Sequence, residues 1–172
     1  MDLIISYAWS HFYLAKPEAI RILQLFGEPA PYIEKTNVMG IAIAHTGLDN
    51  RDVIKRCRQL WHENPLESFE FATKWVPVDY WCSTDLDAMK RLIDENIKDQ
   101  IDENQTWGMK VHKRRWQQYH TSEIIEHLAA DIDRKVDLGN PDRIIWVDVI
   151  GPETAISLLS PEEIFSITRP GA

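Results

Sequence analysis

The sequence predicts an α+β protein made of two successive units, and three observations support this fold class. Apolar residues repeat at helical spacing in several segments and form short strand-like runs between them. These helical and strand-like segments alternate along the whole chain, without a proline-rich linker or a low-complexity stretch. Hydrophobic residues make up 44% and charged residues 27% of the chain, a globular composition that excludes a disordered protein.

The first elements are a strand, a helix and two further strands. Residues 3–7 predict a short buried strand. The helix that follows is expected to have Pro17 in its first turn, where a missing N–H costs little. Residues 32–34 and 38–44 predict two strands joined by a short turn.

A second helix and a fourth strand complete this unit. Asn50 is expected to cap the helix, which keeps the i, i+3, i+4, i+7 apolar spacing and stops before Pro65. Residues 69–78 predict the strand. Strand, helix, strand, strand, helix, strand is the ferredoxin-like order, so residues 1–80 are expected to form a ferredoxin-like domain.

A second α/β unit is expected over residues 81–168. Its elements are, in chain order, a helix begun by Thr84, a strand at 106–112, a helix that is capped by Thr121 or Ser122 and ends before Gly139, and strands at 143–150 and 154–159. The junction between the two units is short, so the two domains are expected to pack against each other.

Charge is distributed unevenly along the second unit. The whole chain carries a formal net charge of −8, which by itself argues against a nucleic-acid binder. Residues 82–104 are rich in acids, whereas residues 105–122 contain none. Within the acid-free segment the cations are Lys110, Lys113, Arg114 and Arg115. This segment is therefore the strongest candidate site in the chain.

Single-stranded RNA is the ligand that suits this segment. Its cations can neutralise phosphates, and Trp116 and Tyr119 offer faces on which an unpaired base can stack. The helix start at Thr121 supplies free N–H groups and a positive dipole end, which bind anions. The candidate RNA-binding residues are Lys110, His112, Lys113, Arg114, Arg115, Trp116, Tyr119, Thr121 and Ser122. The alternative is a solvated basic loop with Trp116 in the core.

No catalytic or cofactor motif is visible in the sequence. Neither a glycine-rich phosphate loop nor a His-Glu-x-x-His zinc motif occurs, and the six histidines show no ligand spacing. Cys57 lies on the apolar face of its helix and is expected in the core. Cys82 is either a buried small residue or, near a helix start, a thiol of lowered pKa. We therefore expect a protein without catalytic activity, cofactor or metal.

Several short segments of the second half keep an order and spacing typical of one family. They are 109–114, 122–125, 133–138, 140–142, 147–151, 155–159 and 161–164. Together they resemble the THUMP domain, and in particular the stand-alone THUMP proteins that act as adaptors in tRNA cytidine acetylation. The first half resembles, more weakly, the ferredoxin-like domain that precedes THUMP in these proteins.

The resemblance implies a function as well as a fold. THUMP modules bind the single-stranded 3′ acceptor end of tRNA, and the ferredoxin-like domain sets the distance to the modified nucleotide. A catalytic domain follows in many family members, whereas this chain ends shortly after its last predicted strand, so we expect the adaptor form. The implied partners are tRNA and a separate tRNA cytidine acetyltransferase that makes N(4)-acetylcytidine.

Two other functions remain open on the sequence. An RNA-binding accessory subunit of another tRNA or rRNA modification enzyme would use the same residues. A protein–protein interaction module without an RNA role would explain the acidity and the seven tryptophans, but not the acid-free basic segment. The absence of signal-peptide features, of an apolar run of membrane-spanning length and of a disulfide framework leads us to expect a cytoplasmic protein with no membrane partner.

Overall fold

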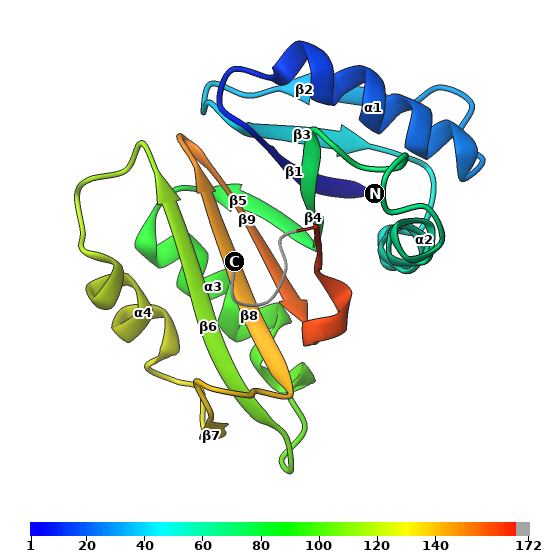
Figure 1. The fold of residues 1–172 in the computed structure, drawn as a ribbon. Helices are drawn as coiled ribbons and strands as arrows, with labels where there is room; N and C mark the ends of the chain where they lie inside the picture. The colour runs from blue at the N-terminus through cyan, green and yellow to red at the C-terminus, as the bar shows by residue number, and fades with distance from the viewer. Residues whose placement is uncertain (168–172) are drawn as a thin grey trace. The chain divides into compact units, whose positions relative to one another are not determined.

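The computed structural model describes residues 1–167, which form two α+β units (Figure 1). The first unit comprises residues 1–78 and the segment that begins at Glu162, and the second comprises residues 79–161. Each unit has its own sheet, its own pair of α-helices and its own hydrophobic core. The α+β fold class expected from the sequence is therefore confirmed.

The first sheet contains five strands, each antiparallel to its neighbours. They are β1 (Asp2–Tyr7), β2 (Tyr32–Lys35), β3 (Ile41–His45), β4 (Ala72–Val78) and β10 (Phe165–Ser166). Their order across the sheet is β10-β4-β1-β3-β2. The order β4-β1-β3-β2, with one helix after β1 and one after β3, is the ferredoxin-like arrangement that the sequence predicts.

Two helices, α1 (Phe12–Leu25) and α2 (Asn50–Glu63), contribute to the core of this unit. Pro17 lies beyond the first turn of α1, so the predicted helix start is wrong. The helix begins earlier because residues from Phe12 onward already pack into the core. Pro17 cannot donate to the carbonyl of Tyr13, but Tyr13 is exposed, so water can satisfy that carbonyl.

The start of α2 differs from the prediction in its cap. Asp49 is the N-cap, and its carboxylate accepts the N–H of Asp52 at 2.9 Å. Asn50 is buried instead, and its side-chain amide donates to the carbonyls of Asp2 and Val78, each at 3.1 Å. Asn50 therefore joins the helix to the paired ends of β1 and β4.

The second sheet is mixed and also contains five strands. They are β5 (Tyr80–Ser83), β6 (Thr106–Arg114), β7 (Lys135–Val136), β8 (Arg143–Ile150) and β9 (Glu153–Leu159). Their order is β5-β9-β8-β6-β7. β6 runs parallel to β7 and β8, whereas β9 is antiparallel to β8 and β5.

Helices α3 (Leu86–Asn96) and α4 (Thr121–Ala129) lie along one face of the second sheet (Figure 1). A short 3₁₀ helix, η1 (Lys98–Gln100), follows α3. Buried residues of both helices form the second core with alternate residues of β6, β8 and β9. Within residues 1–167, no helix combines the length and the apolar character needed to cross a bilayer.

The predicted cap of α3 is wrong by one residue. Asp85 is the N-cap, and its carboxylate accepts the N–H of Ala88 at 2.9 Å. The hydroxyl of Thr84 is engaged elsewhere, because it lies 2.8 Å from the hydroxyl of Thr154 in β9. Thr84 therefore ties the start of the helix to the sheet instead of capping it.

The predicted limits of α4 are also wrong at both ends. His120 occupies the N-cap position, and Thr121 and Ser122 are the first residues of the helix. The helix ends at Ala129, well before Gly139, because residues 135–136 leave it to form β7 beside β6. Val136, which the predicted helix would include, lies in β7 and is 54% exposed.

Three short strands, β5, β7 and β10, are absent from the sequence prediction. β5 occupies the junction expected between the two units and pairs with β9. β10 pairs with β4, so the described end of the chain returns to the first sheet. A short helical turn, η2 (Pro161–Glu163), precedes β10, and the Arg51 guanidinium lies 2.7 Å from the Glu163 carboxylate. Strands of two to four residues are too short to show a clear periodic pattern in the sequence.

We expect Asn50→Ala to lower the free energy of unfolding more than Asp49→Ala does. Loss of the Asp49 cap costs about 1 kcal/mol. Loss of the Asn50 amide removes a donor from two carbonyls, at about 1–3 kcal/mol for each buried polar group left unpaired. Urea unfolding of the two variants measures both effects. A larger loss in Asp49→Ala would contradict the bridging position assigned to Asn50.

Candidate nucleic-acid interface

The candidate RNA-binding residues lie on β6, on the segment after it and on the first turn of α4. β6 extends to Arg114, beyond the end predicted at His112. Odd-numbered side chains of β6 contact the core beneath α3 and α4. Since side chains alternate along a strand, Lys110, His112 and Arg114 lie on the opposite face of the sheet.

A buried carboxylate organises that opposite face. Asp148 of β8 is 2% exposed, and its carboxylate lies 2.7 Å from the guanidinium of Arg114. The same carboxylate accepts the indole N–H of Trp146 at 2.7 Å. The His112 ring stacks on Trp146 at 4.8 Å between centroids, with its Nδ1 3.9 Å from Asp148. The buried carboxylate of Asp148 requires a cation, and Arg114 supplies it. The positive charge of Arg114 is therefore balanced inside the protein.

Lys110 and Arg115 differ from Arg114 in having no such partner. Both side chains are exposed, and neither has a carboxylate partner among the residues that the structure describes. Arg115 has a φ of 56°, the left-handed conformation that glycine or asparagine usually occupies. This conformation turns the chain away from β6 directly after Arg114. Both residues therefore present a positive charge to solvent.

Lys113 lies on the helix side of the sheet. Its ammonium donates to the carbonyl of Tyr119 at 2.6 Å, just before the N-cap of α4. A carbonyl is neutral, so this bond holds the loop between β6 and α4 without cancelling the charge of Lys113. The cation is therefore kept close to the helix start.

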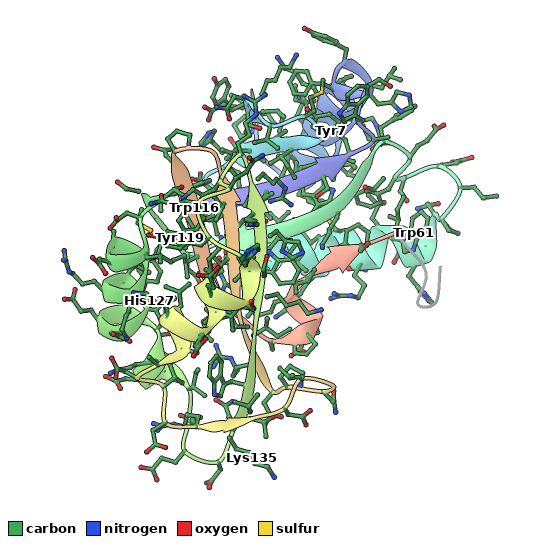
Figure 2. All side chains as sticks on the ribbon, turned by 90° about the vertical axis from the view of Figure 1, so that its left-hand side faces the viewer. Tyr7, Trp61, Trp116, Tyr119, His127 and Lys135 are labelled. Atoms are coloured by element: carbon green, nitrogen blue, oxygen red, sulfur yellow. The ribbon has the colours of Figure 1, made fainter. Side chains whose placement is uncertain are left out.

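Trp116 and Tyr119 stiffen the same loop, which Figure 2 shows with both rings labelled. Both side chains are half-buried against the second core. Their ring centroids are 5.5 Å apart at an interplanar angle of 71°, an edge-to-face contact. The structure thus gives Trp116 the packing position that the sequence left open.

The first turn of α4 offers less positive potential than its sequence suggests. Thr121 is half-buried and Ser122 is exposed, as expected for a helix start beside the basic loop. The Glu123 carboxylate accepts the backbone N–H of His120 at 3.1 Å. Because an acid already lies at this positive helix end, a phosphate gains less there than at an unoccupied helix start.

Both cysteine thiols have a raised pKa. Burial raises the pKa of Cys57, and burial with a smaller contribution from Asp85 raises the pKa of Cys82 to about 11. The alternative of a lowered pKa for Cys82 is therefore wrong. Within residues 1–167, no group of three or more His, Cys, Asp or Glu side chains is placed to hold a metal ion.

Sequence analysis missed Trp146 and Asp148, the β8 residues that hold His112 and Arg114. Asp148 is the single acid inside an otherwise apolar strand, which was a usable indication. The sequence does not reveal that Arg114 is the partner of Asp148, because that pairing depends on the register of β6 with β8. This parallel register places His112 beside Asp148 and Lys110 beside Trp146.

Comparison with known proteins identifies part of the chain. The model of the THUMP domain matches residues 83–159. An uncharacterized protein of Methanocaldococcus jannaschii is 32% identical over 98 residues, which cover 55% of this chain and 27% of that protein. The chain thus spans about a quarter of the length of this relative.

Three solved structures share the fold across both units at low sequence identity. PH1313 from Pyrococcus horikoshii has a TM-score of 0.64 at 15% identity, covering 96% of this chain and 55% of that one. TrmN from Thermus thermophilus has a TM-score of 0.66 at 14% identity, covering 98% and 47%. A 4-thiouridine synthetase in complex with RNA and ATP has a TM-score of 0.53 at 14% identity, covering 96% and 41%. Because the model of the THUMP domain matches residues 83–159, this part of the chain forms a THUMP domain.

Proposed function

We propose that this chain is a tRNA-binding adaptor that presents the 3′ acceptor end to a separate acetyltransferase for N(4)-acetylcytidine formation. The THUMP domain supports an RNA-binding role in tRNA modification. Among the proteins that share the fold are TrmN and a 4-thiouridine synthetase bound to RNA. The observation that carries the proposal is a set of cations without a carboxylate partner in the acid-free segment of this domain: Lys110, Lys113 and Arg115.

These three cations are suited to contact an RNA backbone. Lys110 and Arg114 lie about 13 Å apart along β6 at roughly 3.3 Å per residue, and Arg115 follows directly, a span that one single-stranded segment can follow. Lys113 holds its charge at the carbonyl of Tyr119, two residues before α4 begins at Thr121. Phosphate contacts of this kind position the RNA without reading its sequence.

Arg114 and His112 have a different role in this proposal. The Asp148 carboxylate balances Arg114, and Trp146 stacks on His112, so both side chains are engaged within the sheet. Their contacts link the end of β6 to β8, the strand with which it is paired. Trp116 and Tyr119 similarly hold the following loop, and a loop ordered in advance loses less entropy when it binds.

The chemistry is proposed to come from the partner, a tRNA cytidine acetyltransferase, in the cytoplasm. The support for this part is the resemblance of the THUMP segments to the adaptor proteins. The raised pKa values of both cysteines agree with a chain that does not supply a thiol nucleophile. An accessory subunit of another tRNA or rRNA modification enzyme would use the same interface, and the activity assay below separates the two.

Binding of tRNA should weaken with salt in proportion to the number of phosphate contacts. At roughly 0.7 counterions per contact, three contacts give a log–log slope of about −2. Lys110→Ala, Lys113→Ala and Arg115→Gly should each reduce the magnitude of this slope by about 0.7. Filter binding across a salt series measures the slope. Arg115→Gly also relieves the left-handed backbone, so weaker binding by this variant cannot be attributed to unfolding.

Two further variants serve as controls for this measurement. Lys55 is an exposed lysine on α2 in the first unit, so Lys55→Ala should leave the slope unchanged. Arg114→Ala should lower the free energy of unfolding by roughly 3 kcal/mol, because it leaves the buried Asp148 without its cation. If Lys110→Ala, Lys113→Ala and Arg115→Gly all show the same salt slope as the parent protein, the proposed interface is contradicted.

Acetylation of tRNA should require both this chain and an acetyltransferase. Neither protein alone should convert cytidine efficiently, because one lacks the chemistry and the other lacks the tRNA-binding module. Mass spectrometry of nucleosides after incubation with acetyl donor, tRNA and each protein, separately and together, measures the product. Product formation by this chain alone would contradict the adaptor role, and stimulation of a different modification would favour the accessory-subunit alternative.

A further inference from the structure

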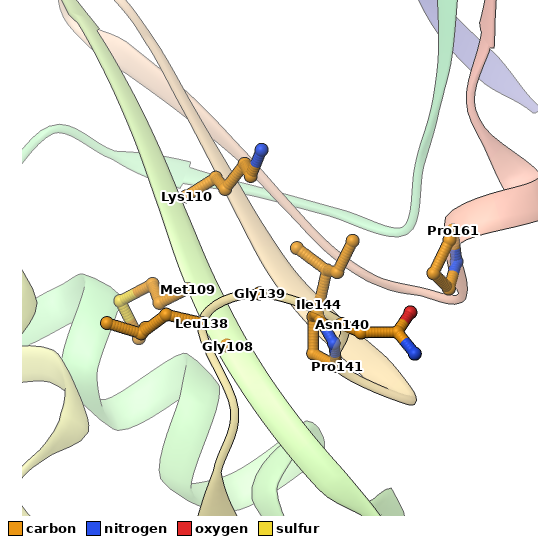
Figure 3. A pocket seen from close by; sticks show the side chains of 9 residues that line it. All are labelled: Gly108, Met109, Lys110, Leu138, Gly139, Asn140, Pro141, Ile144 and Pro161. Atoms are coloured by element: carbon orange, nitrogen blue, oxygen red, sulfur yellow. The ribbon is translucent and has the colours of Figure 1, made fainter. Parts of the chain in front are cut away.

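The THUMP domain has a pocket of about 200 Å³ on the sheet face opposite its helices. Figure 3 shows Lys110 of β6 on one side, Asn140 and Pro161 on the other, and Ile144 of β8 between them. Leu138 and Pro141 add further apolar surface from the loop that joins β7 to β8. The pocket lies beside the first cation of the proposed interface.

The loop that lines the pocket crosses β6 at a glycine, Gly108. A Cβ atom on Gly108 would meet the carbonyl of Asp137 at 3.5 Å and the ring of Pro141 at 3.6 Å, so a larger side chain would push the loop away. The loop is also held from within. The Asp137 carboxylate accepts the backbone N–H groups of Gly139 and Asn140, each at 3.0 Å.

Leu138 is presented to solvent by this held loop. Its side chain is 82% exposed, although Asp137 and Gly139 on either side of it are held by hydrogen bonds. The Lys110 ammonium has no carboxylate partner among the described residues. The Asn140 side chain carries both a donor and an acceptor. The pocket therefore combines an apolar surface, an amide and a cation within the reach of one small ligand.

We propose that this pocket holds the base of one unpaired nucleotide, with its phosphate on Lys110. The inference rests on the proposed RNA-binding function and assigns a place to one nucleotide of the bound strand. A nucleobase offers a flat apolar face for Leu138, Pro141 and Ile144, and a hydrogen-bonding edge for the Asn140 amide. The volume is below the roughly 300–1,000 Å³ of pockets that hold drug-sized ligands, which suits a ligand as small as one base.

The test uses Leu138→Ala and a hairpin RNA with a short unpaired 3′ tail. Each tail nucleotide in turn is replaced by an abasic residue, and affinity is measured by fluorescence anisotropy. The parent protein should lose about tenfold in affinity at one abasic position, since a stacked base contributes roughly 1–3 kcal/mol and 1.4 kcal/mol is tenfold. Leu138→Ala should bind the intact tail about tenfold more weakly and should no longer distinguish that abasic RNA.

Matched variants test whether weaker binding by Leu138→Ala comes from the pocket, from unfolding or from the loss of any exposed leucine. Leu66 is a leucine of the first unit that is 98% exposed, so Leu66→Ala controls for loss of an exposed leucine and should bind like the parent. Leu138→Ala should melt at the parent temperature, because its side chain contributes little to the core. Gly108→Leu should also abolish the abasic discrimination, because the new side chain displaces the loop.

The outcomes separate this inference from the proposed function. If the parent protein binds the hairpin with the expected salt dependence but all abasic RNAs bind alike, the pocket inference is overturned and the RNA-binding function stands. The same holds if Leu138→Ala retains the full abasic discrimination. If no single-stranded tail binds at all, both the interface and the pocket are overturned.

Discussion

The parallel ladder between β6 and β8 determines where each side chain of the proposed interface lies. It runs from Trp107 beside Arg143 to Arg114 beside Ile150, and it directs alternate residues of β6 to the helices or away from them. The register also sets Asp148 next to His112, which brings a buried acid within reach of Arg114. A shift by one residue would turn Lys110, His112 and Arg114 toward the helices and expose the apolar residues, so core packing and the position of Lys110 depend on the same pairing.

The ladder also explains how an acidic chain can carry a basic interface. The net charge of −8 is concentrated elsewhere, and many of the acids of the THUMP domain lie on α3, on η1 and in the turn that follows. These elements cover the sheet face opposite Lys110. Salt at physiological concentration screens exposed charges over about 8 Å, so a phosphate near Lys110 is influenced mainly by its local surroundings. Local charge is therefore a better guide to this site than net charge.

Long periodic elements were predictable from the sequence, and details set by tertiary contacts were not. The ferredoxin-like order and the strand at 143–150 follow from alternation and spacing. Caps were misplaced because Thr84 and Asn50 are good capping residues whose side chains bind strands distant in sequence. The four clustered cations could be identified in the sequence. Only the structure distinguishes Arg114, which a buried acid balances, from Lys110 and Arg115. The pocket was not predictable, since a loop that crosses a glycine leaves no periodic pattern.

Hydrogen–deuterium exchange with and without tRNA tests the central claim most directly, because it reports every backbone segment at once. Bound tRNA should slow exchange in residues 110–122, which carry the free cations and the start of α4, and in the loop at 138–141. Exchange in α3, which carries no residue of the proposed interface, should not change. Protection confined to α3 or to residues 1–78, with none at 110–122, would contradict the interface proposed on the THUMP domain.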